Sequence, residues 1–394
     1  MALSLKLPNA SGQVEAYTLR GTTPVKPAAG VKFNRIAYSA AHVVADPLAA
    51  IDPWLQCAVD WDATIAYRQR LWSLGLGVAE AMDTAQRGMG LDWPTSLELI
   101  RRSLDAAKDV PGALVASGCG TDHLVLENVK SVDEVIAGYE EQMAAIEKLG
   151  GKLIVMASRA LARVAKSPAD YERVYDRILS QAKQPVVLHW LGDMFDPALK
   201  GYWGSDDVDQ AMDTALAVIA AHPDKVDGIK ISLLDKDKEI AMRRRLPAGV
   251  RMFTGDDFNY AELIAGDGVG SEVTHGQSDA LLGIFDAIAP AASAALGELA
   301  QGHLQKFHDI LGPTVPLSRH IFAAPTRFYK TGVVFMAWLN GHQSHFTMVG
   351  GQQSTRSLPH FAELFRLADA ANLLEQPELA VRRMNTLLAL HGVE

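Results

Sequence analysis

The stretch VDGIKIS, residues 226–232, has the composition of a buried β-strand, yet it carries Lys230 near its carboxyl end. A lysine is almost never buried without a partner or a task, because its ammonium group loses hydration in a dry site. Burial also favours the neutral amine, which attacks carbonyl carbon to form a Schiff base. The alternative is a strand-end lysine whose ammonium group reaches water. The stretch alone leaves both interpretations open.

Similar short apolar runs recur along the chain and alternate with longer amphipathic segments. Strands rich in valine and isoleucine that alternate with helices are typical of a parallel sheet covered by helices, and eight such units predict a (β/α)₈ TIM barrel. An open doubly wound sheet is the competing arrangement, but residues 39–42 (SAAH) lack its glycine-rich phosphate turn after the first strand. The predicted strands are residues 35–38, 77–82, 113–116, 152–156, 185–189, 228–231, 250–253 and 268–273.

Helix start signals lie between these strands. Ser131 and Glu134 form a capping box, and Ser167-Pro168 places proline at the first position of another helix. Further barrel helices are predicted over residues 60–74, 206–219 and 257–265. From Ser278 the alternation stops: residues 279–311 read as helical and alanine-rich, and residues 358–391 as two helices split near 372–377. The expected division is an N-terminal β extension (1–32), the barrel (33–280) and a C-terminal helical region (281–394).

Composition excludes several classes of protein. The net charge of −9 and the absence of a long basic run disfavour nucleic-acid binding. The only cysteines, Cys57 and Cys119, form neither a disulfide scaffold nor a CxxC metal motif. No signal-peptide pattern and no apolar run of membrane-spanning length is found. We therefore expect a cytoplasmic protein that acts on a small molecule, without a membrane or nucleic-acid partner.

Polar residues follow most of the predicted strands, and in a barrel the chemistry lies at the carboxyl ends of the strands. Each residue has a simpler explanation. Asp257 could cap the next helix, Thr121 and Asp122 could be turn residues, and a lone His189 is more often a satisfied core histidine. Their recurrence at one end of several strands favours an active site. The set comprises Glu80, Asp83, Thr84, Thr121, Asp122, His189, Asp193, Lys230, Ser232, Gly255, Asp256, Asp257, Ser271, Thr274 and His275.

The order of four short motifs resembles the dihydrodipicolinate synthase / N-acetylneuraminate lyase family of Schiff-base aldolases, in a divergent synthase-like branch. The motifs are VDWD at 59–62, PVVL at 185–188, GIK at 228–230 and TGDD at 254–257. The similarity spans residues 33–280 and continues, more weakly, in the C-terminal helices. The resemblance implies that Lys230 forms an imine with a keto compound, and that the chain assembles as a homo-oligomer, a dimer or tetramer.

The departures from the family pattern are equally informative. The family's GTTG motif, which holds a keto-acid carboxylate, is replaced by MDTAQ at 82–86. Thr84 keeps a hydroxyl, whereas Asp83 would repel a carboxylate. The family's strand-five tyrosine, a proton relay, aligns with His189, and residues 192–195 (GDMF) lack the arginine that grips the synthase's second substrate. We therefore do not expect the synthase of lysine biosynthesis.

These residues lead to one main hypothesis and two alternatives. The main hypothesis is an aldolase or dehydratase of a sugar-derived keto compound or keto acid, with no cofactor beyond an imine on Lys230 and with His189 moving protons. A metal-dependent sugar lyase or isomerase is the first alternative, and a non-catalytic sugar-binding barrel is the second. The expected substrate-binding residues are Asp83, Thr84, Ser232, Gly255, Asp256 and Ser271. The ligands of a divalent metal would be Glu80, Asp83, His189, Asp193, Asp256 and His275.

Overall fold

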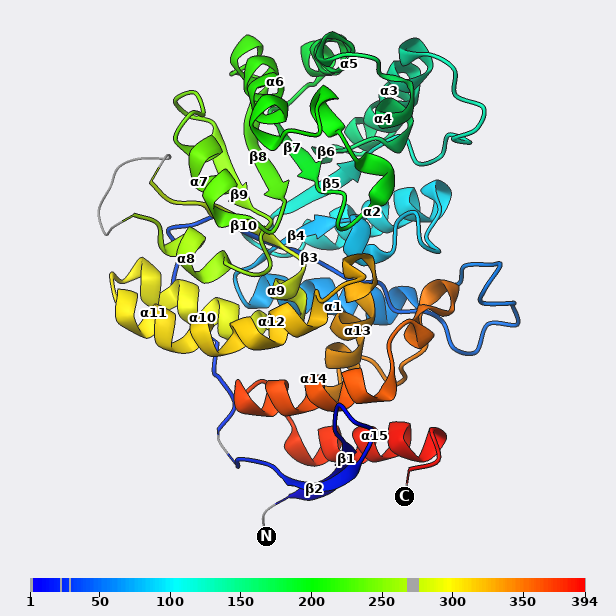
Figure 1. Cartoon of the computed structure of the whole chain (residues 1–394), viewed down its shortest axis with the longest axis vertical. Helices are drawn as coiled ribbons and strands as arrows, with labels where there is room; N and C mark the ends of the chain where they lie inside the picture. Colours follow the sequence, from blue (N-terminus) through cyan, green and yellow to red (C-terminus); the bar gives the residue numbers. More distant parts are fainter. Residues whose placement is uncertain (1–2, 22, 28–29, 268–275, 394) are drawn as a thin grey trace.

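Eight parallel strands close into a barrel in a computed structural model that describes residues 3–21, 23–27, 30–267 and 276–393 (Figure 1). Each strand pairs with the next along the chain, and the last pairs with both its predecessor and the first. The predicted TIM barrel is therefore confirmed. Its strands are β3 (Ala37–Ala40), β4 (Gly77–Glu80), β5 (Val115–Cys119), β6 (Lys152–Met156), β7 (Val186–Leu191), β8 (Val226–Ser232), β9 (Arg251–Thr254) and β10 (Asp279–Leu282).

Apolar side chains fill the inside of the barrel, so it is a packed core and not a channel. Two large rings, Tyr38 and Phe253, lie with their centroids 6.1 Å apart, and small alanines from neighbouring strands accommodate them. Because apolar side chains fill the interior, the polar side chains of a functional site are expected at the ends of the strands. The interior cluster consists of Tyr38, Ala40, Ala79, Met82, Ala116, Ile154, Val187, Phe253 and Leu281.

Helices surround the barrel where the capping signals predicted them. Asp60 caps the first barrel helix by accepting a hydrogen bond from the Ala63 amide at 3.0 Å, and Ser131 caps the third through the Glu134 amide. The barrel helices are α1 (Trp61–Ser73), α2 (Trp93–Ala107), α3 (Val132–Lys148), α4 (Arg159–Val164), α5 (Pro168–Gln181), α6 (Val208–Ala221), α7 (Lys236–Arg243) and α8 (Tyr260–Ala265).

The eighth strand differs from the prediction. Residues 268–273, predicted as this strand, lie outside the described residues, and the strand that closes the barrel is β10. Residues 279–282, predicted as the start of a helix, form this strand. Asp279 ties it to its neighbours, because its carboxylate accepts hydrogen bonds from the Ile36 amide at 2.8 Å and from Arg251 at 2.9 Å. Pairing on both sides thus outweighs the helix propensity of alanine and leucine in this stretch.

The C-terminal helices cover one side of the barrel, and the two predicted helices after residue 358 are present (Figure 1). An antiparallel hairpin, β1 (Ser4–Pro8) with β2 (Val14–Thr18), lies against the last of them. Tyr17 donates a hydrogen bond to Asp369 at 2.6 Å there. The helices are α9 (Ile284–Ala287), α10 (Ala289–Ala300), α11 (Leu304–Leu311), α12 (Val315–Ile321), α13 (Tyr329–Leu339), α14 (Leu358–Ala370) and α15 (Pro377–Leu390).

One hydrophobic cluster joins the hairpin, the first barrel helix and the C-terminal helices. The division of the chain at residues 32 and 280 therefore stays a prediction. Among the described helices, none combines the length and the apolar character needed to cross a membrane.

Candidate active site

Lys230 is buried in the barrel wall on β8, with 4% of its surface exposed. Its register partner on β7 is His189, whose Nε2 lies 3.4 Å from the hydroxyl of Ser232. Gly255 follows β9 and makes room for this group: a Cβ there would lie 2.7 Å from Cε of Lys230 and 2.3 Å from Oγ of Ser232. The strand-end lysine is thus held in the protein interior and does not extend into solvent.

A tyrosine from the C-terminal region completes the site above β4. Asp83 and Thr84 lie in a short 3₁₀ helix, η1 (Asp83–Ala85), directly after that strand. Tyr329, the first residue of α13, donates its hydroxyl hydrogen to Oδ2 of Asp83 at 2.8 Å and also contacts the hydroxyl of Thr84. Its ring stacks on Phe322 at a centroid distance of 4.3 Å, which fixes the phenol in place.

Burial and neighbouring charges shift the pKa of Lys230 and of three groups that interact with it, Asp83, His189 and Asp257. Burial lowers the pKa of Lys230 below its ordinary 10.5, against the opposing charges of Asp83 and Asp257. Burial also opposes ionisation of Asp83, yet Lys230, Lys330 and His189 together hold its pKa below the usual range. Burial, then Lys230, lowers the pKa of His189 well below 6.5. Burial raises the pKa of Asp257 to about 8. At neutral pH the site thus combines a carboxylate, a neutral imidazole and a protonated carboxyl group.

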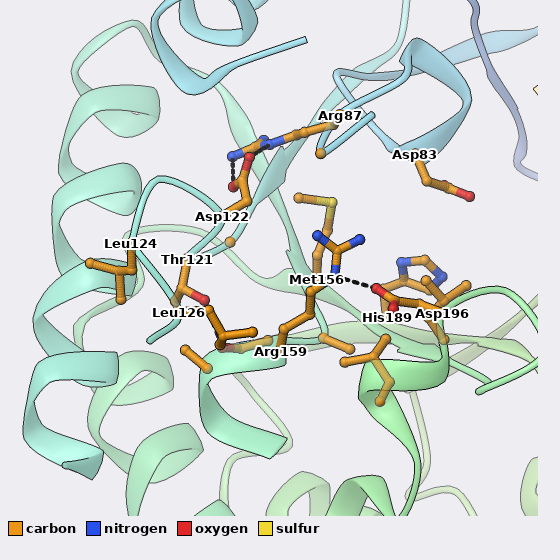
Figure 2. A pocket seen from close by; sticks show the side chains of 17 residues that line it. Asp83, Arg87, Thr121, Asp122, Leu124, Leu126, Met156, Arg159, His189 and Asp196 are labelled. Carbon is orange, nitrogen blue, oxygen red and sulfur yellow. Dashed lines mark hydrogen bonds and ion pairs between the residues drawn. The ribbon is translucent and has the colours of Figure 1, made fainter. Parts of the chain in front are cut away.

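Asp83 and His189 line a cavity of about 170 Å³ at the carboxyl ends of the strands (Figure 2). On one wall Arg87 donates two hydrogen bonds to Asp122, at 3.0 and 2.8 Å, and on the other Arg159 pairs with Asp196. Lys230 does not line this cavity, whereas its neighbours Asp83 and His189 do. A second hollow of about 200 Å³ shares part of this wall and adds Met89, Phe195, Arg327, Phe328, Tyr329 and Lys330.

The two adjacent aspartates after β9 have different roles from those expected. Asp256 accepts hydrogen bonds from the amides of Phe258 and Asn259, at 2.8 and 3.0 Å, so its carboxylate is used by the turn before α8. Asp257 does not cap that helix, because the N-cap residue is Asn259. Its carboxyl group accepts from the Ile284 amide at 2.9 Å, and when it ionises, around pH 8, its charge raises the pKa of Lys230. The predicted Ser271, Thr274 and His275 lie outside the described residues.

Of the six residues considered for a metal site, the five that the structure describes do not form a cluster of three or more ligands. Glu80 faces α1, where its oxygens accept from Nε and Nη2 of Arg68, each at 2.9 Å, and both side chains are fully buried. The carboxylate of Asp256 accepts hydrogen bonds within the turn that follows β9, and Asp193 is exposed. Within the described ranges, which leave out His275, no three side chains of histidine, cysteine, aspartate or glutamate are placed to hold a metal ion. Both oxygens of Glu80 are thus used by Arg68 on the helix side of the barrel wall, because alternate residues of a strand point to opposite faces.

Three site residues were missed in the sequence. Arg159 begins α4 just after β6, so the strand-end rule leads to it once it is applied to the fourth strand. Tyr329 and Lys330 belong to an aromatic and basic stretch, PTRFYK at 325–330, which no local pattern connects with β4. Only the packing of α13 over the strand ends brings them in.

Comparisons with known proteins agree with this architecture. Residues 5–393 match a family model described as "Protein of unknown function (DUF993)". No curated protein matches the chain. Dihydrodipicolinate synthase from Aquifex aeolicus superimposes with a TM-score of 0.64 at 12% identity, covering 87% of this chain and 99% of that one. A putative dihydrodipicolinate synthetase from Pseudomonas aeruginosa gives 0.64 at 14%, covering 86% and 99%. YagE from E. coli K12, of the same family and in complex with pyruvate, gives 0.60 at 14%, covering 92% and 99%. The structural similarity to the dihydrodipicolinate synthase family is thus confirmed, at low identity.

Proposed function

The chain belongs to the DUF993 family of proteins of unknown function, and we propose from its own residues that it is a Schiff-base-forming lyase. The observation that carries the proposal is Lys230, which is buried on β8 beside His189 with its pKa lowered by burial. A lowered pKa increases the fraction of neutral amine at physiological pH, and the neutral amine is the nucleophile. The fold it shares with the dihydrodipicolinate synthase family, of which one member, YagE, was solved in complex with pyruvate, is consistent with a small keto substrate.

The first step forms the imine. The nitrogen of Lys230 attacks the carbonyl carbon of the substrate, and the carbonyl oxygen leaves as water after gaining two protons. One proton comes from the amine and the other from a nearby acid. Asp257, whose pKa is raised by burial to about 8, and the phenol of Tyr329 are suitable donors. Because Lys230 does not line the cavity, its side chain must turn past Asp83 and His189 to meet the carbonyl.

The second step uses the protonated imine as an electron sink. In aldol cleavage the bond between the α and β carbons breaks, its electrons move to the imine nitrogen, and the β hydroxyl loses its proton. In dehydration the α carbon loses a proton and the β hydroxyl leaves as water. The imidazole of His189 is neutral at physiological pH, because burial and Lys230 lower its pKa, so it accepts the proton in either case. His189 then returns its proton, to the α carbon of the enamine after cleavage or to the departing β hydroxyl in dehydration, and hydrolysis of the resulting imine restores Lys230.

The charge of Asp83 restricts which part of the substrate lies beside it. An ionised carboxylate that accepts a hydrogen bond from Tyr329 can also accept from substrate hydroxyls, whereas it repels a substrate carboxylate. A hydroxylated, sugar-derived carbon chain next to the carbonyl fits this environment.

Borohydride trapping tests the proposal. The protein is incubated with pyruvate, hydroxypyruvate, dihydroxyacetone and a panel of ketoses, reduced, and analysed by intact mass and peptide mapping. We expect a covalent adduct on Lys230 with at least one compound, and no adduct in Lys230→Ala. The matched control Lys108→Ala, at an exposed lysine, should label normally. Turnover without an adduct, together with an active Lys230→Ala variant, would overturn the function.

A further inference from the structure

Lys330 is a second buried amine, and no carboxylate of the described residues lies within 4.0 Å of it. Only 4% of its surface is exposed. Its Nζ lies 3.0 Å from the sulfur of Met89 and 5.6 Å from the ring centroid of Tyr329. A thioether is a weak acceptor and cannot balance an ammonium group. A buried cation of this kind is costly unless an anion joins it.

The wall around Lys330 carries more positive than negative charge. Its acidic members, Asp83 and Asp196, already have cationic neighbours: Lys230 acts on Asp83, and Arg159 forms an ion pair with Asp196. Lys330 also acts on Asp83, but neither Lys330 nor the exposed Arg327, whose described contact is with the ring of Phe328, forms an ion pair with a carboxylate of the described residues. The hollow of about 200 Å³ therefore has an excess of positive charge at the end formed by these two residues.

Arg159 adds free donors to this hollow. Its Nε is used by Asp196, and within the described residues no hydrogen-bond acceptor takes Nη1 or Nη2. A Cβ at position 88 would lie 3.1 Å from Nη1, so Gly88 leaves the guanidinium edge uncovered. Figure 2 shows this side chain at the cavity together with Asp83 and His189. Two adjacent N–H groups of a guanidinium match the paired oxygens of a phosphate or carboxylate.

We propose that Lys330, Arg159 and Arg327 bind an anionic group of the substrate, a phosphate or carboxylate remote from the reacting carbonyl. The substrate class is then a phosphorylated or carboxylated keto-sugar, which deepens the proposed function and rests on it. Asp83 supports this orientation, because it repels the anionic end away from its own side of the hollow. Burial lowers the pKa of Lys330 to about 8, and a bound anion raises it again, so that the amine is charged when the site is occupied.

Calorimetric titration with inorganic phosphate and with malonate tests the site without needing the substrate. Wild type and Lys230→Ala should bind the same probe, because neither probe forms an imine. Lys330→Met and Arg159→Gln should each weaken binding about tenfold or more, whereas Lys108→Met, at an exposed lysine, should not. The probe that binds more tightly shows whether phosphate or carboxylate is the preferred anion. Arg159 is 42% exposed, so its variant folds even if the variant of buried Lys330 does not.

The outcomes separate the two proposals. If neither probe binds, or if both variants bind like wild type, the anion site is wrong, whatever borohydride trapping shows. If a probe binds through Lys330 and Arg159 but no carbonyl compound labels Lys230, the proposed function fails and the anion site stands.

Discussion

Tyr329 donates a hydrogen bond to Asp83 at 2.8 Å, although 246 residues separate them in the sequence. The bond joins α13 to the end of β4 and places a phenol beside the carboxylate of Asp83. Without it, Asp83 would be a buried carboxylate stabilised only by the charges of Lys230, Lys330 and His189. The relationship therefore makes the C-terminal helices part of the site.

Replacing Tyr329 with phenylalanine tests this relationship. The variant keeps the stacked ring but removes the donor to Asp83 and the contact with Thr84. A hydrogen bond to a charged group contributes about 1.5–3 kcal/mol, so we expect a loss of stability of this order. Borohydride labelling of Lys230 should slow by about tenfold or more, because proton transfer is impaired. Chemical denaturation and labelling rates measure the two effects; unchanged labelling would remove Tyr329 from the proton-transfer steps.

The pH dependence of labelling reports the pKa of Lys230. Because burial lowers this pKa, neutral amine is present at lower pH than for an ordinary lysine, and the rising limb of the labelling rate should lie below pH 10.5. The charge of Asp83 opposes the shift, so Asp83→Asn should move the limb to still lower pH. Trapping rates measured from pH 6 to 11 locate the rising limb in wild type and in Asp83→Asn. A limb at or above 10.5, or one that Asp83→Asn moves upward, would contradict the assignment.

Asp257 should make stability depend on pH. Its carboxyl group binds a proton up to about pH 8 in the folded protein, because burial disfavours the charge, but releases it near 3.8 when unfolded. The folded state holds more protons in that window, so this contribution to stability falls as pH rises from 3.8 to about 8. Asp257→Asn keeps the oxygen that accepts from Ile284 and cannot ionise. Relative to wild type its melting temperature should therefore rise between pH 5 and 9; a constant difference would show that Asp257 does not titrate in this window.

Glu80 should be essential for stability and not for metal binding. Glu80→Gln leaves the buried guanidinium of Arg68 without its charge partner, which costs about 3–5 kcal/mol. The double variant Arg68→Met with Glu80→Gln removes the unpaired cation and should recover part of that loss. Urea denaturation measures both, with Glu172→Gln at an exposed position of α5 as the control. Equal stability of wild type and Glu80→Gln would contradict the structural role.

Much of the barrel could be predicted from local patterns. Apolar runs of strand length, capping residues and their alternation are local properties, and they identified seven strands close to their observed positions and Lys230 within one of them. The last strand escaped prediction because β10 is too short and too rich in alanine and leucine to differ from a helix. Only pairing with β9 and β3 decides its conformation.

The sequence by itself therefore determined the parallel barrel and the place of a lysine near the carboxyl end of one of its strands, since both depend on periodicity and on the cost of burying charge. Only the tertiary structure decided which groups meet that lysine. Register and closure turned Glu80 toward Arg68 and away from the site, and brought Asp257, in place of Asp256, to Lys230. The packing of α13 added Tyr329 and Lys330. The contacts that α13 makes join residues hundreds of positions apart in the sequence, so no local spacing of residues predicts them.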